Sequence, residues 1–300
     1  MKRRISLAGV LLAALLVHGC SKGSNEKDTQ GSASSSGNKK IMESSSISSS
    51  SISSQNSNAA AAATLHSLEL SIPVSELSEN NETTITLQGI YSDGKKKQLS
   101  ENITWQISDT NVLEVKGMKL IAKIEGSTTL RAEVNGKLSP PITITVYKVI
   151  HGHRLPPEPD PKINNSTLLG IDSNNNGVRD DVERWIYMTY NHPIERGLFM
   201  QSARAYQKVI VDPGRAHETT KYINDSVSCE LFWKYKETNH PITKYRDIEG
   251  EISQIQFNTI NRYIAYKKYN AEFNGEVFGV PPASKDKCEF NENGIFKELY

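Results

Sequence analysis

This sequence of 300 residues has few cysteines and no long apolar run, and its positive and negative charges nearly balance. There are three cysteines, and the apolar segment at residues 5–17 is shorter than the ~20 residues that a helix needs to cross a bilayer. Lysine and arginine number 35 against 34 aspartates and glutamates, which leaves a formal net charge of +1. Because no basic block occurs in the folded region beyond GKKKQ at residues 94–98, the charge offers no case for nucleic acid as a partner.

Familiar catalytic patterns are missing as well. Residues 65–300 contain no Gly-x-Ser-x-Gly, no P-loop and no dinucleotide-binding fingerprint. The segment HETTK at residues 217–221 begins like a zinc-protease motif, but Lys221 stands where the second histidine ligand must be. These absences favour a non-catalytic protein.

The N-terminus is typical of a secreted bacterial protein. A basic start at residues 2–4 precedes the apolar segment, and Cys20 directly follows Gly19. This arrangement resembles a lipobox, which implies that residues 1–20 are a lipoprotein signal peptide and that acylated Cys20 anchors the protein to the membrane. The serine after the cysteine implies, by the same resemblance, the outer membrane. An ordinary cleaved signal is the alternative.

Residues 21–64 form a serine-rich segment of low complexity. Its apolar content is too small to offset the entropy lost on ordering, so we expect a disordered tether that keeps the folded part near the membrane. If Cys20 carries lipid, Cys229 and Cys288 remain as one pair in an oxidising compartment, and we predict a disulfide between them. Two unpaired buried thiols are the alternative.

Residues 65–147 alternate short β-type runs with turn residues. Valine, isoleucine and threonine recur with period two, as in ITITV at residues 142–146, and segments such as SDTN and NGK separate the runs. The pattern predicts an antiparallel β-sandwich of seven strands. The stretch YSDGKKKQLSENITWQISDTNVLEV, followed by EGSTTLRAEV, resembles bacterial Ig-like domains of group 2 (BIG2), the module of intimin- and invasin-type surface proteins. The resemblance implies a spacer or adhesive module without a catalytic site, with Trp105 as the large core residue between the sheets.

Residues 148–171 form a proline-rich linker. Four prolines between positions 156 and 161 favour extended polyproline geometry and therefore a semi-rigid spacer. His151 and His153 lie in this segment without an evident third metal ligand, so we expect both to be exposed to solvent.

The last predicted domain, residues 172–300, opens with a candidate calcium loop. Oxygen-bearing side chains recur at alternate positions, Gly177 stands at position six, and a glutamate closes the pattern at position twelve. This is the ligand spacing of the EF-hand loop, in which the seventh residue contributes its carbonyl oxygen. Position eight is Arg179 instead of an apolar residue, and in this respect the loop resembles the unpaired loops of thrombospondin type 3 repeats. A turn without metal that caps the next helix is the alternative. The predicted ligands of one structural Ca²⁺ are Asp172, Asn174, Asn176, Val178, Asp180 and Glu183.

Four segments with helical patterns follow the first residues of the loop, at 180–191, 193–211, 213–237 and 247–273. Their apolar residues recur at helical spacing, which predicts a bundle of four helices. The predicted fold class is therefore a multidomain chain with a disordered tether, an all-β Ig-like sandwich and a mainly α-helical domain.

These features predict a lipid-anchored protein of the bacterial cell envelope that acts as a non-catalytic adhesion, spacer or interaction protein, with calcium in an architectural role. The expected partners are the membrane, through the N-terminal lipid, and another envelope protein, a host-surface protein or a glycan. The alternative is an envelope enzyme or a ligand-binding receptor whose site lies on the helical domain around Arg262, Tyr263 and Tyr266.

Overall fold

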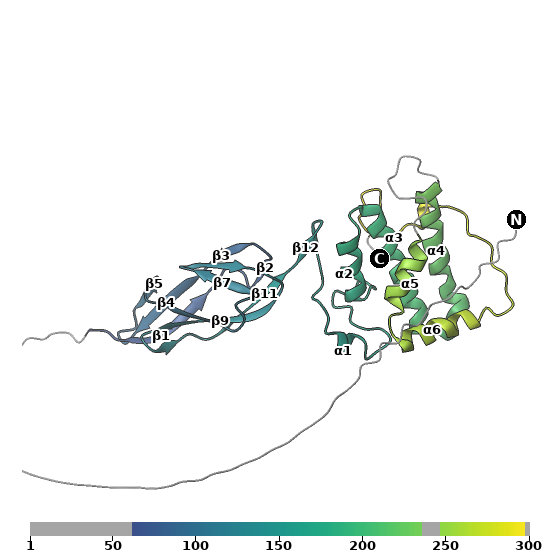
Figure 1. Cartoon of the computed structure of the whole chain (residues 1–300). Coiled ribbons are helices and arrows are strands. Elements are labelled where there is room, and N and C mark those ends of the chain that lie inside the picture. The colour runs from purple at the N-terminus through teal and green to yellow at the C-terminus, as the bar shows by residue number, and fades with distance from the viewer. Residues whose placement is uncertain (1–61, 236–246, 298–300) are drawn as a thin grey trace, which may run out of the picture. The chain divides into compact units, whose positions relative to one another are not determined.

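The structure is a computed structural model that describes residues 62–235 and 247–297 (Figure 1). The predicted signal peptide, Cys20 and nearly all of the predicted tether lie outside the described residues. Within the two described ranges, no helix combines the length and the apolar character needed to cross a bilayer.

The N-terminal domain is a β-sandwich (Figure 1). One sheet has the order β1-β4-β5, a second has the order β10-β9-β11-β2 with β6 also paired to β9, and a third has the order β3-β8-β7. The pairs are antiparallel except that of β2 with β11, which is parallel. The strands are β1 (Leu65–Ser71), β2 (Glu76–Ser78), β3 (Glu82–Thr84), β4 (Thr86–Tyr91), β5 (Lys96–Leu99), β6 (Thr104–Ile107), β7 (Leu113–Lys116), β8 (Lys119–Ala122), β9 (Gly126–Val134), β10 (Lys137–Leu138) and β11 (Ile142–Tyr147).

All seven predicted β-type runs form strands, and short strands appear beside them. The basic segment GKKKQ contributes residues to β5, and Ile85 divides one predicted run into β3 and β4. Alternation decides which residues are buried, as in β9, where Leu130 and Ala132 are 0% exposed. Trp105 is only partly buried against this core, so its prediction as the large central residue is wrong. Its strand pairs with β9, and its side chain packs against the buried cluster.

The linker is more structured than a polyproline spacer. Strands β12 (Val149–Ile150) and β13 (His153–Arg154) form a small hairpin, and helix α1 (Pro161–Asn164) follows. Pro161 begins this helix because Asp160 caps it, accepting N–H groups of the first turn at 2.8 and 3.2 Å. Leu155, which follows the hairpin, is buried in the hydrophobic cluster of the helical domain.

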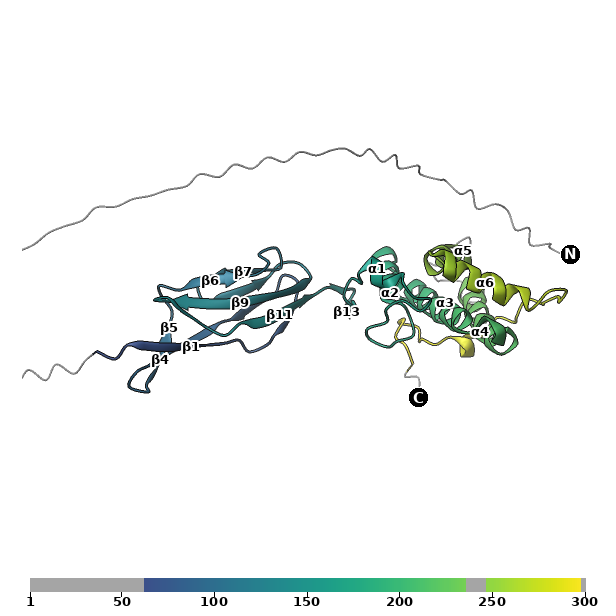
Figure 2. The same cartoon turned by 90° about the horizontal axis from the view of Figure 1, so that it is seen from below.

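The helical domain contains the helices α2 (Asp180–Thr189), α3 (Pro193–Val211), α4 (Ala216–Tyr235), α5 (Ile248–Gln256) and α6 (Ile260–Ala271), with short 3₁₀ turns at Pro213–Arg215 and Lys285–Lys287. Helices α5 and α6 lie on one side of α3, and the C-terminal segment lies on the other (Figure 2). The single helix predicted over 247–273 is wrong. The chain breaks between α5 and α6 because Thr259 caps α6, its side chain accepting the N–H of Arg262 at 3.3 Å.

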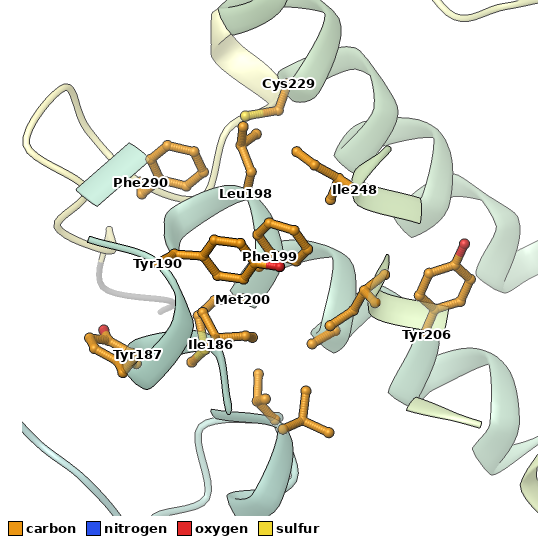
Figure 3. Close-up of a cluster of buried hydrophobic side chains, with 14 of the residues drawn as sticks. Ile186, Tyr187, Tyr190, Leu198, Phe199, Met200, Tyr206, Cys229, Ile248 and Phe290 are labelled. Carbon is orange, nitrogen blue, oxygen red and sulfur yellow. The ribbon is translucent and has the colours of Figure 1, made fainter. Parts of the chain in front are cut away.

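The helical core gathers around α3. The rings of Tyr190 and Phe199 stack with centroids 4.0 Å apart, and Leu198 lies between this pair and Cys229 (Figure 3). Cys229 on α4 forms a disulfide with Cys288, with the two Cα atoms 4.9 Å apart, so the predicted pairing is confirmed. The predicted fold class, a β-sandwich followed by a mainly helical domain, is also confirmed, with separate hydrophobic clusters in the two parts.

Candidate metal site

The predicted calcium loop folds as a closed turn that leads into α2. Both carboxylate oxygens of Asp172 accept backbone N–H groups, from Asn176 at 3.1 Å and from Gly177 at 2.8 Å. Gly177 has a φ of +82°, in the left-handed region that glycine adopts without a Cβ clash. The N–H of Asp180 donates to the carbonyl of Ile171 at 2.7 Å and closes the loop.

Two carboxylates of the loop are buried in the first turn of α2. Asp180 is 1% exposed and Glu183 is 0% exposed. Asp180 Oδ1 accepts the N–H of Ser173 at 2.9 Å. Burial raises the pKa of Asp180 above its ordinary value, and the neighbouring charges of Asp172 and Glu183 add to this rise. The positive end of the α2 dipole favours negative charge at this position.

The Glu183 carboxylate receives hydrogen bonds from three side chains. Asn176 Nδ2 lies 2.7 Å and Asn174 Nδ2 lies 3.1 Å from Oε2, and His153 Nε2 lies 2.6 Å from Oε1. Within the described part of the chain, neither Glu183 nor Asp180 forms an ion pair with a lysine or arginine. Buried carboxylates are normally paired, hydrogen-bonded or metal-bound, and in this loop the basic group on Glu183 is the imidazole of His153.

The donor set fits a calcium ion. Three carboxylates, two amide oxygens and the carbonyl of Val178 make an oxygen-only set, which selects a hard cation. Asn174 and Asn176 now present their NH₂ groups to Glu183, and rotation of each amide would present its oxygen instead. No three histidine, cysteine, aspartate or glutamate side chains in ranges 62–235 and 247–297 form a ready-made metal group. The loop side chains could therefore hold calcium only after rearrangement.

His153 is a residue that the sequence reasoning placed wrongly. It is only partly exposed, and besides its contact with Glu183 its ring stacks on Tyr187, with centroids 4.0 Å apart and planes 14° from parallel. His151, two residues earlier, is exposed as predicted. No signal in the local sequence distinguishes the two histidines, because the contact joins residues 30 positions apart.

Arg179, at position eight of the loop, joins the loop to α5. Its side chain is 0% exposed, Nη1 donates to the carbonyl of Gln256 at 3.1 Å, and Nη2 donates to the carbonyl of Ile255 at 3.0 Å. These carbonyls belong to the last turn of α5, where a cation is favourable. Asp181 pairs with the same guanidinium at 2.5 Å. Paired EF-hands have an apolar residue at position eight of the loop. The arginine at this position is therefore the sequence signal that this loop packs differently, against α5.

The residues predicted for the alternative site do not share one exposed face. Arg262 is 0% exposed, Tyr263 is 51% exposed, and Tyr266 is partly buried and stacks on Phe257 at 4.2 Å. A surface depression of about 710 Å³ beside α6 includes none of the three predicted residues. Its lining includes Leu168, Asn261, Ile264 and Lys268.

Comparison with known proteins adds little to this description. No protein-family model matches the chain, and no curated protein matches it. Among solved structures, the chain is similar to domains 4 and 5 of the S-layer protein SbsC, at 14% identity over 28% of this chain and 53% of that one, with a TM-score of 0.23. An intimin mutant of EHEC O157:H7 matches at 14% identity over 44% of this chain and 71% of that one, with a TM-score of 0.22. A polysaccharide lyase matches at 12% identity over 69% of this chain and 34% of that one, with a TM-score of 0.20.

The chain spans about half of the S-layer fragment that it matches, 53% of its length. At identities of 12–14% and TM-scores of 0.20–0.23, these likenesses carry no argument about function.

Proposed function

We propose that this chain is a lipid-anchored protein of the bacterial cell envelope whose β-sandwich acts as a spacer or adhesive module. In this proposal, Cys20 carries the lipid, the outer membrane is the site of anchoring, and the sandwich is of the BIG2 type. The helical domain is ordered by one Ca²⁺ and by the disulfide between Cys229 and Cys288. Its partner is another envelope protein, a host-surface protein or a glycan.

The observation that carries the calcium proposal is the burial of Asp180 and Glu183 without a lysine or arginine partner among the described residues. Their position in the first turn of α2 makes an ion at this loop architectural, because it would stabilise the start of the helix. The envelope address rests on the lipobox-like N-terminus.

Thermal unfolding of the mature chain, followed by helical circular dichroism in excess calcium and in chelator, tests the calcium proposal. Loops with three formal charges suit the weak affinities of extracellular modules, with a Kd of about 10⁻⁴–10⁻³ M. At calcium concentrations 10 to 100 times such a Kd, binding stabilises the folded state by about 1–3 kcal/mol. We therefore expect Tm to rise by about 3–10 °C. An unchanged Tm would overturn the proposal.

Glu183→Gln separates calcium binding from packing. The substitution removes the negative charge that an ion would need and keeps the side-chain shape, so we expect the variant not to respond to calcium. Because the glutamine has one acceptor oxygen where Glu183 has two, the stability of the variant in chelator serves as its own baseline. The matched control is Glu292→Gln, since Glu292 has 70% of its side chain exposed and pairs with Lys285 on the surface. This control should respond to calcium as the wild type does.

A further inference from the structure

Glu183 is held from two directions by parts of the chain that are distant in sequence. Inside the loop, Asn174 and Asn176 donate to Oε2. From outside the loop, His153 Nε2 lies 2.6 Å from Oε1. An ionised carboxylate only accepts hydrogen bonds, so a hydrogen bond from this imidazole to ionised Glu183 requires a proton on Nε2.

The β12–β13 hairpin fixes the place of His153. His151 and Gly152 form its two-residue turn with φ values of +52° and +78°, the left-handed pair that matches the twist of a hairpin. Leu155 follows directly and is 2% exposed within the core of the helical domain, and Ile150 packs on the same core. The imidazole is thus presented by an element that is itself anchored.

Helix α2 completes the arrangement. Glu183 and Tyr187 are four positions apart and therefore lie one above the other on one face of the helix. The imidazole of His153 stacks on the Tyr187 ring at 4.0 Å while it contacts Glu183. One histidine side chain therefore contacts the closing acid of the loop and the helix turn that follows it.

The two sets of donors differ in what calcium coordination would require of them. Asn174 and Asn176 are themselves predicted ligands, so their NH₂ groups must turn away from Glu183 for their oxygens to serve. His153 lies outside the ligand set and can keep its hydrogen bond to one lone pair of Glu183. Ligating carboxylates are commonly oriented by such outer partners, and loss of an outer partner typically weakens metal affinity about 10–100-fold.

We propose that His153 is a positioning residue of the calcium site, which orients Glu183 for the ion and thereby couples calcium binding to docking of the β12–β13 hairpin on α2. This inference rests on the proposed calcium site. Reciprocity of linked equilibria requires that, if the docked hairpin strengthens calcium binding, calcium strengthens the docking of the hairpin. Calcium would then stiffen the segment that leads into the helical domain.

Calcium titration of the mature chain by calorimetry, with two substitutions of His153, tests the proposal. His153→Phe keeps a ring to stack on Tyr187 but removes the donor, and we expect calcium affinity to fall about 10-fold or more. His153→Gln loses the ring but retains an amide donor that can reach Glu183, and we expect it to restore most of the affinity, within about 3-fold of wild type. The control is His151→Asn, since asparagine tolerates the positive φ of this exposed turn residue.

Hydrogen exchange of the backbone amides at residues 149–155 supplies the second measurement, and its wild-type arm does not depend on how well the variants fold. Calcium should slow exchange at these amides in the wild-type chain, and the slowing should be lost in His153→Phe. Equal calcium affinity in wild type and His153→Phe, or hairpin exchange that calcium leaves unchanged in wild type, would overturn the coupling while the calcium site stands. A wild-type chain that binds no calcium would remove the site and this inference together.

Discussion

The guanidinium groups of Arg179 and Arg262 meet at one acceptor, the side-chain oxygen of Asn258, at 3.4 Å and 2.6 Å respectively. Both arginines are 0% exposed. Arg179 belongs to the candidate calcium loop and Arg262 to α6, while Asn258 lies in the break between α5 and α6. Burial, and secondarily the charge of Arg179, lower the pKa of Arg262 to about 10. The loop and the last two helices are therefore joined through a buried polar contact.

Arg262→Lys should destabilise the helical domain strongly. The guanidinium donates to the carbonyls of Asn164, Thr167 and Leu168 as well as to side-chain oxygens, and all five of its N–H groups have acceptors. A lysine has only three donors and lacks the planar fork, so we expect a loss of about 3 kcal/mol in urea unfolding. Arg215→Lys, in an exposed pair with Glu218, should cost less than about 0.5 kcal/mol. Equal losses in the two variants would show that the buried network contributes little.

Gly170→Ala should be among the most damaging single-methyl changes in the chain. Gly170 has a φ of +68°, and a Cβ there would lie 2.3 Å from Arg179 Cδ and 2.5 Å from Asn164 Oδ1. We expect the free energy of unfolding to fall by about 1–2 kcal/mol through backbone strain and by about 1–3 kcal/mol more through overpacking. Gly136→Ala has a similar φ of +72° with nothing within 4 Å, so it measures the strain alone. The close approach predicts a difference between the two variants, and similar unfolding energies would contradict it.

Removing the disulfide should weaken the attachment of the C-terminal segment. Cys229 and Cys288 are 59 residues apart, and closing a loop of this length contributes about 4 kcal/mol in the chain-entropy model. The double variant Cys229→Ala, Cys288→Ala should therefore unfold at lower denaturant, and non-reducing mass analysis of the wild type should find no free thiol at these positions. Detection of two free thiols in the wild type would show that the disulfide does not form and therefore contributes nothing to stability.

The β-sandwich should depend more on Leu130 than on Trp105. Leu130 is 0% exposed on β9, and Leu130→Ala should cost about 3 kcal/mol through lost burial and a cavity. Trp105 is partly exposed, so water can occupy part of the space left by Trp105→Ala, and we expect a loss of about 2 kcal/mol. Urea unfolding of the two variants, followed by β-sheet circular dichroism, shows which substitution lowers the free energy of unfolding more. A larger loss for Trp105→Ala would place this ring at the centre of the core.

Lipid anchoring is tested at Cys20. Metabolic labelling of cells with a fatty-acid analogue should mark the wild-type protein and should not mark Cys20→Ala, because the thiol is the predicted site of acylation. The Cys20→Ala protein should also leave the membrane fraction. Label retained by the variant would rule out Cys20 as the acylated residue.

Features set by neighbours along the chain were predictable from the sequence. Period-two alternation predicted the strands, helical spacing predicted α2 and α3, and the two cysteines left after Cys20 predicted the disulfide. The break before α6 also had a local signal, since Thr259 is a preferred capping residue, but the continuous apolar pattern concealed it.

Contacts between distant segments decided the rest. The sequence by itself determined the candidate calcium loop, because ligand spacing and the turn at Gly177 depend on consecutive residues. Only the tertiary structure placed His153 on Glu183, buried Arg262 beneath α1 and gave Arg179 its acceptors on α5. A charged side chain can be buried only where hydrogen-bonding partners converge on it, and for Glu183 and Arg262 such partners come from segments 30 and 98 positions away along the chain.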